Sequence, residues 1–319
     1  MKKVILSLLV LATVGMVACK KNEIVPPPSS TSDLGTYFSD NLDNAKQTFS
    51  INTNVLNTFT GENGVVVNVP ANSFVNSNGT AVSGVVNFEL IEVLDLSSMV
   101  TLNKTTTSNG EILVSGGQIK LMASQNSNQV FLAPGMAVQV NIPTANVDNQ
   151  MALFIGSQNS NGDVDWTPSV GDTIQQDSIV IFNDTINGGN NWGSFYSFDF
   201  NSDSLGWINC DYFWDNTAPA TNVIAQLDTV YNTSNTVCYL AFPGINSLMG
   251  MYGNYSVNTG GFTANNVPSG SAVTFVCISE INGQYYSAFV NSTILMNHIE
   301  NITMLPTTEA ALQTAISNL

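Results

Sequence analysis

Short runs of β-branched residues, broken by Asn-Gly pairs, dominate this chain from about residue 46 onward. In the run 136–142, Met136, Val138, Val140 and Ile142 alternate with polar residues, which is the period of a half-buried strand. Asn-Gly supplies the positive φ angles that a tight hairpin turn needs. Similar runs lie at 65–69, 85–93 and 118–123, and the Asn-Gly pairs begin at Asn63, Asn78, Asn109, Asn161 and Asn282. The pattern predicts an all-β chain with two β-sandwich-like domains.

Only two segments favour a helix. Residues 37–46 have an ambiguous pattern. Residues 307–318 follow a proline, and Thr307 is the expected N-cap of a short C-terminal helix. Its apolar stripe consists of Ala311, Leu312, Ala315 and Ile316. We expect this helix to pack on the second β domain.

The charge balance excludes one class of partner. The chain has 319 residues, with 23 Asp and Glu against 7 Lys and no Arg, and a net charge of −16. Proteins that bind nucleic acid need Lys and Arg to displace phosphate counterions, so nucleic acid is excluded as a partner. A single His leaves little room for Ser-His-Asp, Cys-His or multi-His zinc chemistry. We therefore expect no enzymatic activity.

The first twenty residues have the pattern of an export signal. Two lysines precede the apolar run 4–17, which leads into Ala18 and Cys19. A charged start, an apolar core of roughly 7–15 residues and a small residue before the cut are typical of a secretory signal peptide. The run is shorter than the about 20 apolar residues that a membrane-spanning helix needs. We expect residues 1–18 to be removed.

The end of this segment, Met16-Val17-Ala18-Cys19, resembles the lipobox of bacterial lipoproteins. The resemblance implies cleavage between Ala18 and Cys19 and acylation, such as palmitate, of Cys19. The alternative is an ordinary signal peptide with an incidental Cys. Residues 19–36 are rich in Pro and Ser and predict an extended tether. Their start, Cys19-Lys20-Lys21, is similar to lipoproteins of Bacteroidota-type envelopes. Asp is absent just after Cys19, which by analogy with lipoproteins of enteric bacteria favours the outer membrane, with the folded part on the cell surface or facing the periplasm.

A second resemblance concerns the folded part. The stretch 64–74, Gly-Val-Val-Val-Asn-Val-Pro-Ala-Asn-Ser-Phe, resembles the opening of the β-sandwich domain of netrin receptors and ankyrins. Segments 107–110, 115–117 and 132–135 resemble lipoproteins of Bacteroidota that carry a related domain. The resemblance covers about residues 46–145 and implies a β-sandwich there. Self-cleavage at a His-Phe-Ser site is not implied, because the only His is followed by Ile299.

These features divide the chain into five expected parts. They are a lipoprotein signal peptide (1–18), a tether (19–36), a β-sandwich domain (37–145), bridging β-hairpins (146–204) and a second β domain with the C-terminal helix (205–319).

Four alternating side chains form a candidate calcium loop, namely Asn159, Asn161, Asp163 and Asp165. Calcium takes six to eight oxygen ligands, and a loop of Asp and Asn supplies several of them. The twelve-residue EF-hand pattern is absent. An Asn-Gly hairpin whose Trp166 packs inward is the favoured interpretation, and no other cofactor is expected.

An aromatic cluster and several carboxylates are further candidates. Trp207, Tyr212 and Trp214 form a candidate stacking platform for sugar rings, although core packing is the favoured role of such residues. The pairs Asp211 with Asp215 and Asp199 with Asp203 suggest glycosidase carboxylates only weakly. We interpret them as solvated charge.

Three cysteines remain beside Cys19. Cys238 and Cys277 lie in apolar, strand-like runs, so a disulfide between them with Cys210 as a buried thiol is one alternative. Free buried thiols are the other. The spacing contains no Cys-x-x-Cys pair and disfavours zinc. We expect His298 to be structural.

The resulting hypothesis is a lipid-anchored cell-envelope protein that acts as a non-catalytic binding or structural module. The alternative is a surface carbohydrate-binding or adhesive module, with calcium assistance. The expected partners are the membrane, through the N-terminal lipid, and a glycan or an envelope protein. A carboxylate hydrolase ranks last.

Overall fold

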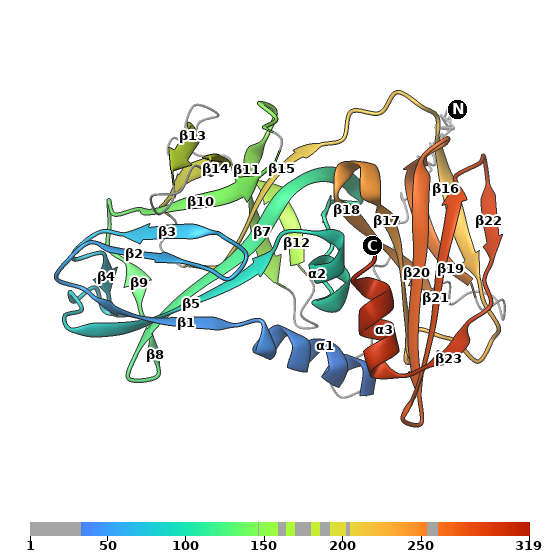
Figure 1. The fold of residues 1–319 in the computed structure, drawn as a ribbon, viewed down its shortest axis with the longest axis horizontal. Helices are drawn as coiled ribbons and strands as arrows, with labels where there is room; N and C mark the ends of the chain where they lie inside the picture. The colour runs from blue at the N-terminus through green and yellow to red at the C-terminus, as the bar shows by residue number, and fades with distance from the viewer. Residues whose placement is uncertain are drawn as a thin grey trace, which may run out of the picture.

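The computed structural model describes residues 33–145, 147–158, 164–169, 180–185, 192–201, 205–253 and 261–319. These residues form two β bodies that lie side by side, with helices between them and along one side (Figure 1). The predicted all-β fold with a short C-terminal helix is confirmed.

The first body is a sandwich of two sheets. One sheet has the strand order β1-β5-β7-β15-β11-β12, with β6 and β8 paired to β7, and the other has the order β13-β14-β10-β3-β2. Strands β4 and β9 form a separate pair. The bounds are β1 Gln47–Asn52, β2 Asn57–Thr60, β3 Val66–Val69, β4 Phe74–Val75, β5 Val85–Val93, β6 Thr107–Ser108, β7 Glu111–Gln125, β8 Asn128–Gln129, β9 Phe131–Leu132, β10 Val138–Thr144, β11 Ala152–Gln158, β12 Val164–Pro168, β13 Val180–Thr185, β14 Trp192–Phe200 and β15 Trp207–Phe213.

Side chains from alternating positions of both sheets fill the first core. In β10, Val138, Val140 and Ile142 are buried as the alternation predicts. They meet Phe88 and Leu90 of β5 in the same apolar cluster. The period of two therefore fixed which face of each strand turns inward.

A buried carboxylate ties the two sheets together. Glu92 lies in β5 and accepts hydrogen bonds from the backbone N–H groups of Asn63 and Val65, each at 2.9 Å, and from Gln47 Nε2 at 2.8 Å. A Cβ on Gly61 would lie 2.5 Å from this carboxyl group. The turn around Asn63 and Gly64 is thus held from the opposite sheet, because its backbone donors satisfy a charge that would otherwise be buried without partners.

The second body is one continuous sheet of eight strands in the order β22-β16-β19-β18-β17-β20-β21-β23. It folds around its own apolar core, to which Leu240, Phe262 and Phe275 contribute. The predicted hairpin turn at Asn282 and Gly283 joins β20 to β21, and both residues have positive φ angles. The bounds are β16 Ala220–Gln226, β17 Thr236–Phe242, a 3₁₀ helix Pro243–Ile245, β18 Ser247–Gly253, β19 Gly261–Pro268, β20 Ala272–Ile281, β21 Gln284–Thr293, β22 His298–Asn301 and β23 Leu305–Thr307.

The helices are α1 (Asp33–Asn44), α2 (Leu96–Thr101) and α3 (Glu309–Ile316). In α3 the N-cap is Thr308 and not the predicted Thr307, because Thr307 still pairs with Tyr285 in the sheet. The helix contacts α2 as well as β21, so it packs on more than the second body.

Helix α2 is only six residues long and was not predicted from the sequence. A capping box begins it: the Asp95 carboxylate accepts from Ser98 N–H at 2.7 Å, and Asp95 N–H donates to Ser98 Oγ at 3.1 Å. Such a box satisfies backbone donors that the first helical turn leaves unpaired.

The predicted domain boundaries are wrong between residues 146 and 213. Strands β11 to β14, expected as a bridge over 146–204, belong to the two sheets of the first sandwich. Strand β15, expected to open the second domain at residue 205, lies between β7 and β11. Its Ile208 and Cys210 side chains are in the first core. The connection between the bodies is therefore the segment 214–219.

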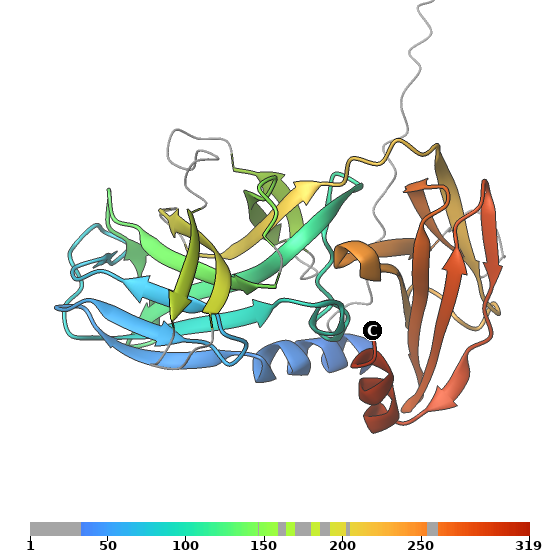
Figure 2. The same ribbon diagram turned by 45° about the horizontal axis from the view of Figure 1, so that its top comes forward.

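A shared apolar cluster joins the two bodies. It combines Tyr37 of α1, Trp166 of β12, Tyr239 of β17 and Leu312 of α3 with side chains of α2. Figures 1 and 2 show α1, α2 and α3 beside this junction. Because one core includes side chains from both bodies, they are packed as a single unit.

Hydrogen bonds cross the same junction. Thr106 N–H donates to the Leu248 carbonyl at 2.9 Å, and Leu248 N–H donates to Thr106 Oγ1 at 2.8 Å. Asn246 Nδ2 donates to the carbonyl groups of Leu94 (3.0 Å) and Ser115 (3.2 Å). These bonds fix the register of β18 against the first body.

No helix among the described residues is long and apolar enough to cross a membrane.

Candidate ligand-binding groove

The predicted processing and lipidation residues, Ala18 and Cys19, lie outside the described residues. The same holds for the predicted signal peptide and for residues 19–32 of the predicted tether. Residues 33–36 were also predicted as tether, but they begin α1 and Leu34 is fully buried, so the predicted boundary at residue 36 is wrong.

Three members of the candidate calcium loop, Asn159, Asn161 and Asp163, also lie outside the described residues. The fourth, Asp165, is exposed on β12 and accepts a 3.4 Å hydrogen bond from Asn109 N–H. Strands β11 and β12 pair as a hairpin, and Trp166 is fully buried, as the hairpin interpretation predicts. Within the described ranges, no three His, Cys, Asp or Glu side chains gather as metal ligands.

The three candidate stacking aromatics do not form one platform. Trp207 is 2% exposed and belongs to the shared core at the junction. Tyr212 is half-buried against the first core. Burial raises the pKa of Tyr212, and its hydrogen bond with Asp148 adds to this rise. Trp214 lines the groove described below, and neither Trp207 nor Tyr212 belongs to its lining. The prediction of a common stacking platform is therefore wrong, because the three side chains lie in three different environments.

Trp207 lies between two of the few lysines. Its ring centroid is 5.5 Å from Lys104 Nζ and 5.6 Å from Lys120 Nζ, within cation–π range. Burial, and then the neighbouring Lys46, lower the pKa of Lys120. This arrangement supports a structural role for Trp207.

An open groove of about 850 Å³ lies at one end of the second body. Four segments contribute to its walls: 214–218 in the connection, 242–245 after β17, 269–274 at the β19–β20 turn, and 291–293 at the end of β21. Trp214 is half-buried and packs against both the first and the second core. The groove thus lies where the connection crosses the second sheet.

Backbone hydrogen bonds fix the rim of the groove. Ser269 N–H donates to the Pro219 carbonyl at 2.9 Å, and Gly270 N–H donates to the Ile294 carbonyl at 2.7 Å. Trp214 N–H donates to the Ile112 carbonyl at 3.0 Å, and the Trp214 ring meets Phe242 edge-on, with 5.8 Å between centroids. The walls are therefore formed before any ligand binds.

The pair Asp211 with Asp215 does not present two carboxylates to one ligand, and the pair Asp199 with Asp203 is only partly within the described residues. Asp211 is fully buried, whereas Asp215 and Asp199 are exposed, and Asp203 lies outside the described residues. The interpretation as solvated charge is therefore wrong for Asp211. Burial raises the pKa of Asp211 well above its usual value, although hydrogen bonds from Ser115 and Asn209 oppose this rise.

Cys238 and Cys277 are direct cross-strand partners in β17 and β20. Both are buried free thiols in the structure, as is Cys210, which corresponds to the second alternative that the sequence left open. Burial raises the pKa of the Cys210 and Cys238 thiols. A raised pKa keeps these sulfurs protonated and unreactive.

A thiol count distinguishes the two alternatives. We expect the folded protein to react with a thiol reagent at Cys210, Cys238 and Cys277 only after unfolding, because all three are buried. A Cys19→Ser chain unfolded without reductant should then titrate all three thiols. A single titratable thiol would instead show a disulfide between Cys238 and Cys277.

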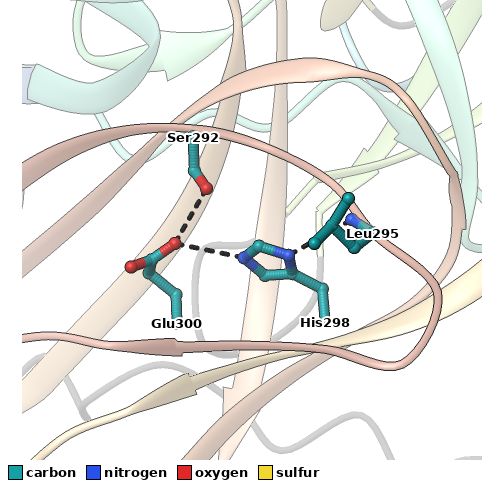
Figure 3. A network of polar contacts seen from close by, with 4 residues as sticks. All are labelled: Ser292, Leu295, His298 and Glu300. Atoms are coloured by element: carbon teal, nitrogen blue, oxygen red, sulfur yellow. Dashed lines mark hydrogen bonds and ion pairs between the residues drawn. The ribbon is translucent and has the colours of Figure 1, made fainter.

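His298 belongs to a polar network at the open edge of the second sheet (Figure 3). Its Nδ1 accepts from Leu295 N–H at 3.2 Å, so the proton of the neutral ring lies on Nε2, which is 3.1 Å from Glu300 Oε2. Ser292 Oγ donates to the same carboxylate oxygen at 2.8 Å. The carboxylate is the central member, so the imidazole does not activate the serine. The His298 ring also stacks on Phe275, which supports the predicted structural role.

Sequence reasoning identified Trp214 but not the rest of the groove. Ser269, Asn291 and Thr293 are ordinary turn and strand-end residues in the sequence, and no local motif marks them. They meet Trp214 only because the sheet brings segments more than fifty residues apart together.

No protein-family model, curated protein or solved structure matches this chain.

Proposed function

We propose that this protein is a lipid-anchored protein of the cell envelope, and that its two β bodies act as a non-catalytic binding or structural module. The observation that carries the proposal is the order of features in the first 32 residues. A charged start, an apolar run, a lipobox-like end at Cys19 and a Pro- and Ser-rich tether precede the folded body. This order suits a domain that is held at a distance from a membrane.

The location that best fits this proposal is the outer membrane, with the folded body on the cell surface or facing the periplasm. The acidic character of the chain and its lack of Arg suit neither a nucleic-acid partner nor an anionic surface.

The Cys19→Ala variant tests the anchor. The native chain should fractionate with membranes and incorporate labelled palmitate, whereas Cys19→Ala should lose the label and become soluble. The Cys277→Ala variant, which removes a buried thiol of the folded body, should behave like the native chain. Membrane fractionation of Cys19→Ala at the native level would contradict the proposal.

Proteinase K treatment of intact cells tests the orientation. Digestion would place the module on the outer surface, and protection until the outer membrane is opened would place it in the periplasm. Trypsin is a poor probe, since no Lys follows Lys120.

A carbohydrate-binding role is the second candidate, and the groove at Trp214 is the specific observation that favours it. The groove is open and contains a half-buried aromatic side chain. Such a site suits a sugar better than a catalytic reaction, because its lining includes no carboxylate or imidazole.

A further inference from the structure

We propose that the groove at Trp214 binds a neutral oligosaccharide. This inference names the ligand class of the binding module proposed above and rests on that proposal. It requires only the described residues of the groove, and its test does not depend on the lipid anchor.

The size of the groove fits a small chain of sugars. Its volume of about 850 Å³ lies within the usual range for small-molecule sites, roughly 300–1,000 Å³. It is open rather than enclosed, so a longer ligand can extend beyond it at either end.

The groove lining carries no formal charge. Its residues include no Asp, Glu, Lys or His, in a chain whose net charge is −16. Glu300, which lies behind the wall, is already bonded to Ser292 Oγ and His298 Nε2, and the exposed Asp215 is not among the lining residues. An anionic ligand would find no cation to pair with, and a cationic ligand would find no carboxylate in the lining. The lining therefore selects an uncharged ligand.

Neutral hydrogen-bonding groups surround the groove instead. Ser269, Thr293 and Asn216 contribute hydroxyl and amide groups, which both donate and accept. Ser271 Oγ donates to the Pro268 carbonyl at 2.7 Å and offers the groove an acceptor. The Asn291 amide is oriented by Thr274, whose Oγ1 donates to Asn291 Oδ1 at 2.7 Å. A ligand with many hydroxyl groups matches this lining, because each hydroxyl also both donates and accepts.

The indole of Trp214 supplies the apolar part of the site. Phe242 supports it edge-on from within the protein, and the rest of the side chain lines the groove. An aromatic ring contributes a flat apolar surface at low conformational cost, and a sugar ring offers a matching face of C–H groups. Since backbone hydrogen bonds already hold the rim, little ordering is needed on binding.

Binding can be measured on the full-length, detergent-solubilised protein. The probes are cellohexaose, maltohexaose, xylohexaose, mannohexaose and chitohexaose, with tri-galacturonate as the anionic comparison. We expect at least one neutral oligosaccharide to bind and to change the tryptophan fluorescence, and tri-galacturonate to bind at least about tenfold more weakly, a difference of about 1.4 kcal/mol.

Variants locate the site. Trp214→Ala should weaken binding at least about tenfold, the size expected for losing one stacking surface. Phe213→Ala is the matched control, because Phe213 is the adjacent aromatic, is 41% exposed and does not line the groove. It should bind as the native chain does. Thr293→Tyr leaves Trp214 in place and fills the exposed rim, so it should also weaken binding while the fold, followed by circular dichroism, is unchanged.

Three results would overturn the inference: no binding of any neutral probe by the native protein, native affinity in both Trp214→Ala and Thr293→Tyr, or preference for the anionic probe. None of them affects the membrane fractionation of Cys19→Ala. Failure of the oligosaccharide proposal can therefore be distinguished from failure of the proposed anchoring.

Discussion

Replacing Trp166 with alanine is expected to lower the free energy of unfolding by about 3–5 kcal/mol, the range for removing a large buried aromatic. Trp166 is 0% exposed and belongs to the core shared by the two bodies. Its Nε1 donates to the Thr105 carbonyl at 2.8 Å. Truncation would leave a cavity and would remove this hydrogen bond from the part-buried Thr105 carbonyl, and each of these costs stability.

Trp214→Ala provides the matched comparison, since it removes the same side chain from a half-buried position in the groove. Trp214→Ala should lower the free energy of unfolding by much less than Trp166→Ala does, because the side chain that it removes buries less apolar surface. Denaturant unfolding followed by far-ultraviolet circular dichroism measures both without relying on tryptophan emission. Equal midpoints for the two variants would contradict the role of Trp166 in the junction.

Strand existence was predictable because the signal is local. The run Val85–Val93 was expected as a strand and is β5 with the same bounds. The Asn282-Gly283 turn also followed from two adjacent residues, since their positive φ angles are a property of Asn and Gly themselves. Neither feature depends on what the segment packs against.

Domain boundaries were not predictable for the opposite reason. The composition of β15 indicates a buried strand, but nothing in residues 207–213 indicates that β7 and β11 are its neighbours. Sheet partners are chosen over long sequence distances. The aromatic cluster was therefore assigned to the second domain, although most of it completes the first.

The candidate site was likewise predictable only where the signal is local in the sequence. An aromatic cluster pointed to Trp214, yet sequence alone did not separate it from Trp207, which is buried in the junction. In β15, Ile208, Cys210 and Tyr212 face the first core in regular alternation. Trp207, Asn209 and Asp211 lie on the opposite face and are also buried. Because both faces of this strand are covered, alternation does not bring Asp211 to the surface, although a charged residue is not expected in the interior.

The stability of the protein should depend on pH through Asp211. Asn209 Nδ2 donates to Asp211 Oδ2, and the Asp211 side chain is fully buried. Burial raises the pKa of this carboxyl group in the folded state well above the unfolded value of about 3.9. The folded state therefore binds the proton more tightly than the unfolded state. The stabilisation is fully present below about pH 4 and is lost as the pH rises toward the folded-state pKa, by up to about 1.4 kcal/mol per pH unit.

Asp211→Asn should remove this slope, since an amide of the same shape is neutral throughout and can still accept from Asn209. At pH values above the unfolded-state pKa, the free energy of unfolding of Asp211→Asn should increase relative to that of the native protein as the pH rises. Asp215→Asn, which neutralises an exposed carboxylate four residues away, should keep the native slope. Urea unfolding of the three proteins between pH 4.5 and 8 measures the effect. Parallel curves for the native protein and Asp211→Asn would show that Asp211 does not titrate in this range.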